Sequence, residues 1–183
     1  MTGSPDTPIF SLPALTLVTG GARSGKSHQA ERLARGSGLA RRYIATATIW
    51  DDEMATRIAR HIEDRGDGWE TIEAPLDLGP ALAAAPADSV TLIDCATLWL
   101  TNHLLAEHDL AAEADRLLAA LAACPGPVIV VTNEVGWGIV PENALARTFR
   151  DEQGRLNQRL AAQAGLVVAV ISGLPLALKG RLP

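Results

Sequence analysis

Residues 15–27 read Leu-Thr-Leu-Val-Thr-Gly-Gly-Ala-Arg-Ser-Gly-Lys-Ser, and this stretch decides the fold. Residues 20–27 match G-x-x-x-x-G-K-[ST], the phosphate-binding P-loop pattern. The apolar and β-branched residues 14–19 predict a short buried strand before it, and residues 28–33 suit a helix after it. In that context the backbone N–H groups of the turn point into one concavity and bind phosphate oxygens. A glycine-rich turn that binds nothing is the alternative, but the flanking strand and helix favour a nucleoside-triphosphate site.

Two side chains of this loop have predicted roles in the reaction. Lys26 would reach the terminal phosphates, and the hydroxyl of Ser27 would bind Mg²⁺. A second metal ligand is expected from Asp94, which ends the apolar strand 90–93 in the manner of a Walker B aspartate. An aspartate that only caps the following helix is the alternative. The need of a P-loop for a nearby acid favours the metal ligand.

The composition is that of a single globular domain. The chain has 183 residues, 48% of them hydrophobic and 20% charged, which allows one substantial core. We expect residues 1–13 to form a flexible tail and residues 14–183 to form the domain. The net charge of −5 disfavours nucleic acid as a partner, and no apolar run is long enough to predict a transmembrane segment. Cys95 and Cys124 lie in apolar surroundings without metal-ligand spacing, so we predict buried thiols and a cytoplasmic location.

Strand-like and helix-like segments alternate along the chain after the P-loop. The predicted strands are 43–47, 69–73, 90–93, 128–132 and 166–172, the last followed by a short tail. The predicted helices are 52–65, 75–85, 96–107, 110–123 and 141–164, with Gly165 as the cap of the last. Apolar strands that alternate with helices predict an α/β three-layer P-loop fold with a mostly parallel sheet. Ligands of such sheets bind at the carboxyl ends of the strands.

Histidines are the next candidates for chemistry. His61 follows Arg57 by four residues, so the two share one face of the predicted helix 52–65, beside an apolar stripe. A neutral imidazole there could attack phosphorus and form a covalent phosphoramidate, but spacing alone favours a histidine at the edge of the core. His103 and His108 are five residues apart, which predicts no two-histidine metal face.

Two further groups of polar residues have more than one interpretation. Asn133 and Glu134 follow a predicted strand, where ligand contact and an ordinary turn are equally compatible with the sequence. Arginines recur along the last long helix, at Arg147, Arg150, Arg155 and Arg159. A solvated ion-pair face explains each of them best, and binding of phosphate across a subunit boundary is the second interpretation.

Six stretches, taken in order, resemble one family. They are Thr-Gly-Gly-Ala-Arg-Ser-Gly-Lys-Ser (19–27), Tyr-Ile-Ala-Thr-Ala (43–47), Asp-Asp-Glu-Met (51–54) leading to Arg57 and His61, Asp-Cys-Ala-Thr-Leu-Trp-Leu-Thr-Asn (94–102), Val-Thr-Asn-Glu-Val-Gly-Trp-Gly-Ile-Val-Pro (131–141) and Phe-Arg-Asp-Glu-Gln-Gly-Arg-Leu-Asn-Gln-Arg-Leu-Ala (149–161). Over residues 15–179 the chain resembles the bifunctional adenosylcobinamide kinase / adenosylcobinamide-phosphate guanylyltransferase family of vitamin B12 biosynthesis. The resemblance implies two reactions. ATP or GTP phosphorylates adenosylcobinamide, and GMP from GTP is then transferred to adenosylcobinamide phosphate, which gives adenosyl-GDP-cobinamide and pyrophosphate.

The resemblance also implies the residues of the site. The family transfers GMP through a guanylylated histidine, and the matching position is His61; some relatives carry two adjacent histidines where this chain has Arg60-His61. It further implies a RecA-like fold and a homotrimer with sites at subunit boundaries, which would give the arginines of the last helix a use. The expected nucleotide contacts are Gly20, Gly21, Ala22, Arg23, Ser24, Gly25, Lys26, Ser27, Ala45, Thr46, Ala47, Ile62, Glu63, Asp64, Arg65 and Glu73, with Asp94 added as the predicted metal ligand.

Two other functions fit part of the sequence. A simple P-loop kinase for a small alcohol or nucleotide would use Lys26 in the same way and leave His61 as a structural residue. A non-enzymatic nucleotide-sensing module would bind nucleotide without turnover, and no feature of the sequence specifically supports it. Covalent labelling of the chain by GTP distinguishes the bifunctional enzyme from both.

Overall fold

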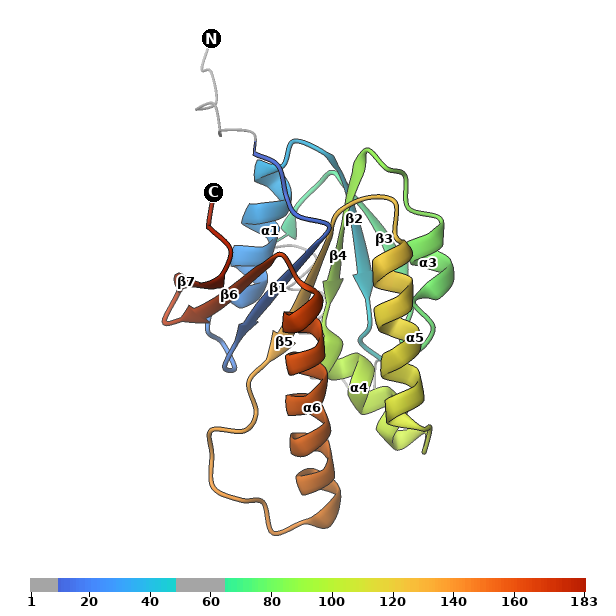
Figure 1. Cartoon of the computed structure of the whole chain (residues 1–183), viewed down its shortest axis with the longest axis vertical. Coiled ribbons are helices and arrows are strands. Elements are labelled where there is room, and N and C mark those ends of the chain that lie inside the picture. Colours follow the sequence, from blue (N-terminus) through green and yellow to red (C-terminus); the bar gives the residue numbers. More distant parts are fainter. Residues whose placement is uncertain (1–9, 49–64) are drawn as a thin grey trace.

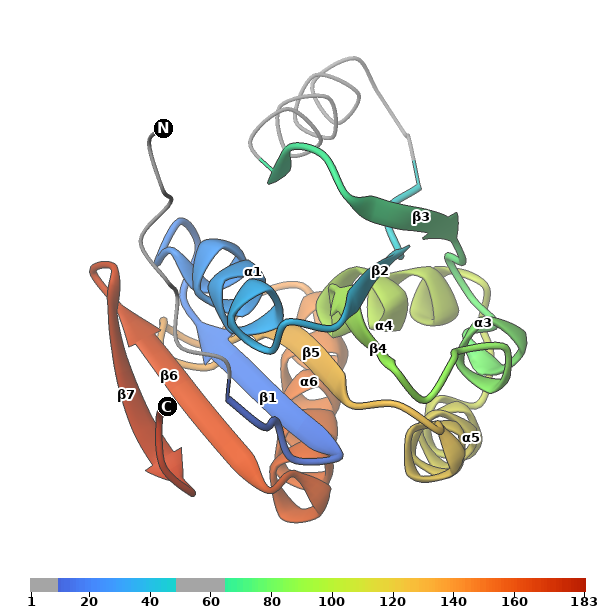
Figure 2. The same ribbon diagram turned by 90° about the horizontal axis from the view of Figure 1, so that it is seen from above.

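Seven strands form one sheet within residues 10–48 and 65–183, the part of the chain that the computed structural model describes (Figures 1 and 2). The strands are β1 (Leu15–Gly20), β2 (Ala40–Ala45), β3 (Trp69–Glu73), β4 (Ser89–Asp94), β5 (Val128–Asn133), β6 (Leu166–Ile171) and β7 (Leu174–Lys179). Their order across the sheet is β3-β2-β4-β5-β1-β6-β7. All neighbours are parallel except β6 and β7. The predicted α/β fold with a mostly parallel sheet is therefore confirmed.

Helices cover both faces of this sheet. The helices of the described residues are α1 (Lys26–Gly36), α3 (Gly79–Ala83), α4 (Ala96–Leu105), α5 (Leu110–Ala123) and α6 (Ala144–Gln163). Figure 2 shows α1 on one face and the remaining helices on the other. Within the described ranges, none of these helices combines the length and the apolarity that crossing a bilayer would need.

Side-chain alternation along the strands produces two hydrophobic cores. In β1, Leu17 packs into the core under α3 to α6, whereas the next residue, Val18, packs into the core under α1. In β5, Val130 and Val131 divide between the two cores in the same way. Because both faces are covered, the central strands are apolar at successive positions. Each fully buried side chain of this kind contributes about 1.5–3 kcal/mol to folding.

The predicted C-terminal tail is wrong, because residues 174–179 form β7. A turn at Ser172 and Gly173, with φ angles of 53° and 81°, reverses the chain, and β7 then pairs antiparallel with β6. Positive φ at both central residues is what a tight hairpin turn requires. A Ser-Gly pair between two apolar runs is a hairpin signal that the sequence-based prediction overlooked.

Several predicted boundaries also need correction. The last helix begins at Ala144 and not at residue 141, because the Asn143 side chain caps it by accepting hydrogen bonds from the N–H groups of Leu145 and Ala146. Extended Ala164, and not Gly165, occupies its C-cap. The predicted strand 43–47 is β2 at 40–45, and the predicted helix 75–85 is reduced to α3. The predicted helix 52–65, and His61 with it, lies outside the described residues except at its last position.

Candidate nucleotide-binding site

The register of the parallel strands brings the predicted site residues to one edge of the sheet. Ala45, the last residue of β2, pairs with Glu73 on one side and with Asp94 on the other. Gly20, at the end of β1, pairs with Asn133 at the end of β5. These carboxyl ends lie at the lower end of the sheet in Figure 1. Ligands of open α/β sheets bind at this edge.

The P-loop makes a tight turn between β1 and α1. A Cβ atom at Gly20 would lie 2.5 Å from the Ser24 hydroxyl oxygen and 2.5 Å from the Val170 carbonyl oxygen, so no side chain fits there. Gly25, at the N-cap of α1, has φ 91°, which glycine adopts with little strain. The Gly25 carbonyl accepts the first helical hydrogen bond from the N–H of Gln29 at 3.0 Å. The N-terminal N–H groups and the positive end of the α1 dipole therefore lie at the carboxyl edge.

Lys26 is held against the loop that precedes it. It is the first residue of α1 and largely buried, and its Nζ donates a hydrogen bond to the carbonyl of Gly21 at 3.2 Å. The ammonium group thus lies inside the loop, where it and the backbone N–H groups can meet the same phosphate. Ser27 follows in the first turn of α1 and is half-buried. Both positions suit the roles predicted for these residues.

Asp94 lies two strands away from the P-loop strand, because β5 separates β4 from β1. This corresponds to about 10 Å between the two backbones. Burial raises the pKa of the Cys95 thiol to about 11; the charge of Asp94 adds to this rise, and the charge of Lys26 opposes it. Both charges are thus close enough to act on one buried thiol, and that thiol is neutral at physiological pH.

The oxygen donors at this edge fit Mg²⁺. Ser27 offers a hydroxyl and Asp94 a half-buried carboxylate, and Mg²⁺ prefers oxygen ligands. Mg²⁺ usually binds proteins through one or two side chains together with substrate phosphates. The chemistry of these two donor groups therefore fits a Mg²⁺–nucleotide complex, in which phosphate oxygens supply further ligands.

Another acidic side chain, Glu134, is fixed at the same edge. Its backbone N–H donates to the carbonyl of Gly20 at 3.1 Å. Its Oε1 accepts hydrogen bonds from the Thr19 hydroxyl at 2.9 Å and from the Asn157 amide at 3.2 Å. Residues from β1 and α6 thus hold the carboxylate beside the first residue of the P-loop. Of the two interpretations of Asn133 and Glu134, this position supports ligand contact.

Asn157, which donates to Glu134, belongs to a buried hydrogen-bond network between α6 and the end of β5. Asn157 also donates to the carbonyl of Asn133 at 3.0 Å and accepts from the Thr132 hydroxyl at 2.7 Å. Gln153 donates to Asn157 Oδ1 at 2.8 Å, and both Gln153 and Thr132 are fully buried. This network cannot be predicted from local sequence, because its α6 and β5 members are 21 to 25 residues apart. No local pattern marks a Gln-x-x-x-Asn pair as buried.

The predicted contact segment Ala45–Ala47 is anchored by its central residue. Thr46 is fully buried, and its hydroxyl donates to the Cys95 carbonyl and accepts from the Cys95 N–H, both at 2.8 Å. Asn102 of α4 donates to the Thr46 carbonyl at 2.8 Å. The Thr46 side chain is thus engaged within the protein. Half-buried Ala45 and Ala47 are the parts of this segment that a ligand can reach.

Arg65 is packed into the fold on the α1 side of the sheet. Its guanidinium carbon lies 3.7 Å from the centre of the Tyr43 ring, and its Nη2 donates to the Thr71 hydroxyl at 2.9 Å. Arg35 of α1 donates to the Arg65 carbonyl at 2.6 Å. Most of the Arg65 side chain is therefore occupied by protein contacts. The remaining predicted contacts Ile62, Glu63 and Asp64 lie outside the described residues, as does His61.

The four arginines of α6 make contacts within the same chain. Arg150 pairs with Asp151, Arg155 with Glu152, and Arg159 with Asp115 on α5. Arg147 donates to the backbone carbonyls of Pro141 and Glu142 at 2.9 and 2.6 Å. Within one chain, the solvated ion-pair interpretation explains Arg150, Arg155 and Arg159, whereas Arg147 is held by backbone carbonyls.

Comparison with known proteins gives matches over nearly the whole chain. A family model described as cobinamide kinase / cobinamide phosphate guanyltransferase matches residues 16–178. The chain is 48% identical over 168 residues to the bifunctional adenosylcobalamin biosynthesis protein CobP of Pseudomonas aeruginosa, covering 90% of this chain and 97% of the relative. It is 47% identical over 182 residues to the bifunctional adenosylcobalamin biosynthesis protein CobU of Salmonella typhimurium, covering 90% of this chain and 99% of the relative.

A solved structure supports the fold independently. The crystal structure of the RadB recombinase is similar to this chain with a TM-score of 0.52 at 19% sequence identity. The match covers 86% of this chain and 74% of the recombinase. At this identity the similarity concerns the fold alone, and it agrees with a RecA-like P-loop architecture.

Proposed function

Because this chain belongs to the cobinamide kinase / cobinamide phosphate guanyltransferase family, we propose that one nucleotide site serves both of its reactions. The chain is a bifunctional enzyme of adenosylcobalamin biosynthesis. It phosphorylates adenosylcobinamide and then transfers GMP to the product. The observation that carries this function is the family match over residues 16–178, together with a P-loop whose lysine, serine and helix N-terminus lie at the carboxyl edge of the sheet.

In the kinase step, the hydroxyl of the aminopropanol arm of adenosylcobinamide attacks the γ-phosphorus of ATP or GTP. The new P–O bond forms as the bond to the β-phosphate oxygen breaks, and the nucleoside diphosphate leaves. Lys26 and the N–H groups at the start of α1 stabilise the charge that develops on the phosphates. Mg²⁺, held by Ser27 and Asp94, would neutralise phosphate charge when bound.

Glu134 is the residue that we assign as proton acceptor of the kinase step. Its Oε1 is oriented by Thr19 and Asn157, and its backbone is tied to Gly20. The carboxylate is therefore fixed at the phosphate loop before substrate arrives, as general-base catalysis requires. The proton of the acceptor hydroxyl would pass to this carboxylate as the P–O bond forms.

In the transferase step, we assign His61 as the nucleophile. The imidazole nitrogen attacks the α-phosphorus of GTP, a P–N bond forms, and pyrophosphate leaves. A phosphate oxygen of adenosylcobinamide phosphate then attacks the same phosphorus and displaces the histidine. Residues 62–65, Ala45–Ala47 and Glu73 would contact the nucleotide. Ala45 and Glu73 support this assignment because they pair directly at the carboxyl edge, next to Asp94.

We further propose a cytoplasmic homotrimer of single domains, residues 14–183, with sites at subunit boundaries. The loop between β5 and α6, residues 134–143, extends away from the sheet (Figure 1) and is called the arm below. Its Trp137 and Ile139 are 81% and 95% exposed. Large apolar side chains at such exposure are typical of surfaces that a partner covers. Free Cys95 and Cys124 are compatible with a reducing compartment.

The decisive experiment is covalent labelling with GTP carrying label in the α-phosphate. The wild-type chain should retain acid-labile label after denaturation, and His61→Ala should retain none. Kinase activity of His61→Ala with ATP is the control for folding, because His61 takes no part in that step. Label that persists in His61→Ala would overturn the nucleophile assignment. Kinase turnover without label on the wild-type chain would favour the simple kinase.

A further inference from the structure

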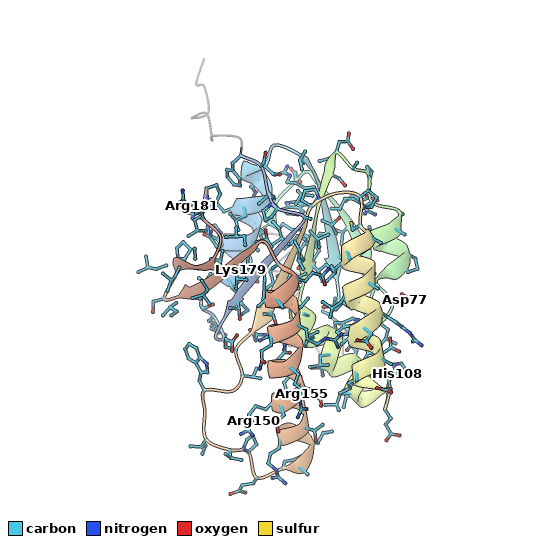
Figure 3. The ribbon with its side chains drawn as sticks, viewed as in Figure 1. Asp77, His108, Arg150, Arg155, Lys179 and Arg181 are labelled. Atoms are coloured by element: carbon cyan, nitrogen blue, oxygen red, sulfur yellow. The ribbon has the colours of Figure 1, made fainter. Side chains whose placement is uncertain are left out.

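A pocket of about 450 Å³ lies between α4, α5 and the segment that follows β3, away from the P-loop. It is lined by Leu76, Trp99, Leu117 and other apolar side chains, but also by His103, His108 and Glu113. No step of the two reactions uses these three polar residues. They come from the last turn of α4, the α4–α5 loop and the first turn of α5. Figure 3 labels His108 beside the lower end of α5 and labels Asp77, another lining residue, higher along the same helix.

The three side chains direct their donor atoms at one another. The Nδ1 atoms of His103 and His108 are 2.9 Å apart, and Glu113 Oε2 lies 4.0 Å from His103 Nδ1. One ligand atom from each residue falls within 4.8 Å of the other two. The five-residue spacing, which predicted no two-histidine metal face, therefore does not keep the two imidazole nitrogens apart. Glu107, with φ 56°, turns the chain, and the His108 N–H donates to the His103 carbonyl at 3.1 Å, which folds the second imidazole back onto the first.

A backbone contact fixes the tautomer of His103. Its Nε2 lies 3.2 Å from the Leu76 carbonyl, an acceptor only, so Nε2 carries the proton and Nδ1 presents a lone pair to the cluster. The ring also packs against Trp99, with centroids 4.5 Å apart. Metal-binding histidines characteristically donate their second N–H to a carbonyl or carboxylate in this way.

The carboxylate of Glu113 is oriented as well. Its Oε1 pairs with Arg116 Nη1 at 2.6 Å, one turn along α5, which leaves Oε2 directed at His103. Arg116 is 74% exposed, so its charge is largely screened by solvent. The tautomer of His103 and the side-chain orientation of Glu113 are thus both fixed by contacts within the protein.

We propose that His103, His108 and Glu113 form a binding site for a divalent transition metal ion of the zinc class. Two imidazole nitrogens and one carboxylate oxygen suit zinc, with a water or an exogenous donor from the pocket in the fourth position. Zn–N bonds of about 2.0–2.1 Å place two ligand nitrogens roughly 3.3 Å apart in a tetrahedral site. The imidazoles therefore need to separate by only a few tenths of an ångström, while the His108 proton moves from Nδ1 to Nε2. The metal would tie the end of α4 to the start of α5.

The test is a titration of tag-free, chelator-treated full-length protein with Zn²⁺ by calorimetry, and with Co²⁺ by visible absorption. Saturating Mg²⁺–nucleotide is present throughout to occupy the P-loop. We expect one equivalent of Zn²⁺ and the intense absorption of tetrahedral Co²⁺. A Zn²⁺ concentration of 100 times Kd should raise the melting temperature by about 5–10 °C.

Substitutions distinguish Zn²⁺ binding at this cluster from Zn²⁺ binding by other side chains of the protein. His108 is exposed, so His108→Ala should fold normally and still lose at least about 10-fold in Zn²⁺ affinity; Glu113→Gln should behave likewise. His108→Cys supplies a thiolate and should restore tight binding. Asp77→Asn on the same pocket wall and His28→Ala on α1 are matched controls that should leave affinity unchanged. Wild-type protein that binds no Zn²⁺, or affinity unaffected by His108→Ala, would overturn the proposal.

Discussion

Glu134 illustrates how a catalytic role can depend on contacts from distant segments. Its carboxylate accepts one hydrogen bond from Thr19 in β1 and one from Asn157 in α6. Thr19 and Glu134 are 115 residues apart in sequence. Because two donors meet at one oxygen, the side chain has a fixed position, and its second oxygen can serve a substrate. The assignment as proton acceptor predicts a specific kinetic effect.

Glu134→Gln should lower kcat of the kinase step by about 10²- to 10⁴-fold, the usual contribution of a positioned general base. The side-chain carbonyl oxygen of glutamine can accept the same hydrogen bonds from Thr19 and Asn157 as the carboxylate oxygen does, so KM for nucleotide should change little. Steady-state kinase kinetics with ATP measure both constants. Guanylylation of His61 by GTP should proceed normally, and Glu107→Gln, at an exposed position outside the arm, is the matched control. A kcat within threefold of wild type would exclude the proposed role.

Glu31 on α1 predicts a pH effect on stability. Burial raises the pKa of this carboxyl above its ordinary value of 4.5; the charge of Asp94 adds to the rise, and Arg35 opposes it. The folded state therefore holds the proton to higher pH than the unfolded chain does. Stability contributed by the protonated form is present below pH 4.5 and is lost as the pH rises through the folded pKa.

Glu31→Gln removes this loss and should stabilise the fold at pH 7–8 by an amount on the order of 1 kcal/mol, as is typical of single substitutions. The gain should shrink toward zero as the pH approaches the ordinary carboxyl value. Urea denaturation at a series of pH values gives the difference in unfolding free energy. A Glu31→Gln gain that is constant with pH would contradict the assignment.

The nucleotide-binding residues could be predicted from sequence where the chemistry is local. The P-loop needs Gly20, Gly25, Lys26 and Ser27 at fixed spacing, so one short stretch contains the whole phosphate cradle. The Glu134 contacts and the histidine cluster arise only when α6 packs on β5 and when the α4–α5 loop reverses. Spacing along the chain carries no information about either event.

At the scale of elements, the position of α6 against the sheet depends on two of its polar side chains, which are directed into the protein. Gln153 and Asn157 face Thr132 and Asn133 at the end of β5. A buried polar group without partners is costly. Here the Gln153 Nε2, the Asn157 amide and the Thr132 hydroxyl bond to one another, whereas Gln153 Oε1 has no hydrogen-bond partner among the described residues. The network thus fixes the rotation of α6 about its axis relative to the carboxyl edge.

Asn157→Ala should destabilise the fold by about 1–3 kcal/mol, because Thr132 and Gln153 each lose a partner in a buried environment. Kinase kcat should also fall, because Glu134 loses one of its two side-chain donors. Chemical denaturation and kinase assays measure the two effects. Exposed Gln158→Ala on the same helix is the control. Full activity and stability of Asn157→Ala would show that the network is dispensable.

Element prediction succeeded where apolar runs are continuous. Strand 69–73 and helix 110–123 match β3 and α5 at both ends. It failed at β7, whose alternating exposed leucines lack the uninterrupted apolar run of the central strands. It also failed at the start of α6, because the Pro141-Glu142 pair and the Asn143 cap, two residues after Pro141, are both starting signals. Hydrogen bonds to the Asn143 side chain decide between them.

At the scale of the whole molecule, the exposed arm is the feature that a lone chain does not explain. Ile139 is 95% exposed, and Val140 beside it is 64% exposed. The arm and the arginine-bearing half of α6, with Arg150 and Arg155, lie at the same end of the molecule in Figure 3. A partner subunit seated on the arm would therefore lie next to these arginines. This is the arrangement that sites at subunit boundaries require.

Ile139→Asp should convert the proposed trimer to monomers. A buried charge at a central apolar contact costs at least about 2 kcal/mol, which corresponds to roughly 30-fold weaker association. Light scattering coupled to size-exclusion chromatography gives the mass of each variant. Ala119→Asp, on the exposed side of α5, should leave the mass unchanged. A wild-type protein of monomer mass, or a trimer that tolerates Ile139→Asp, would contradict the assembly.

The strand order also has a consequence for the synthesis of this protein on the ribosome. The P-loop strand β1 lies near the N-terminus, but it pairs with β5 and β6, which end at residues 133 and 171. Neither neighbour exists until residues 128–133 and 166–171 have been translated. Parallel pairing over such separations forms slowly, because a long loop must close first. The nucleotide motif is thus translated early, but it becomes a folded site only after residue 171 has been translated.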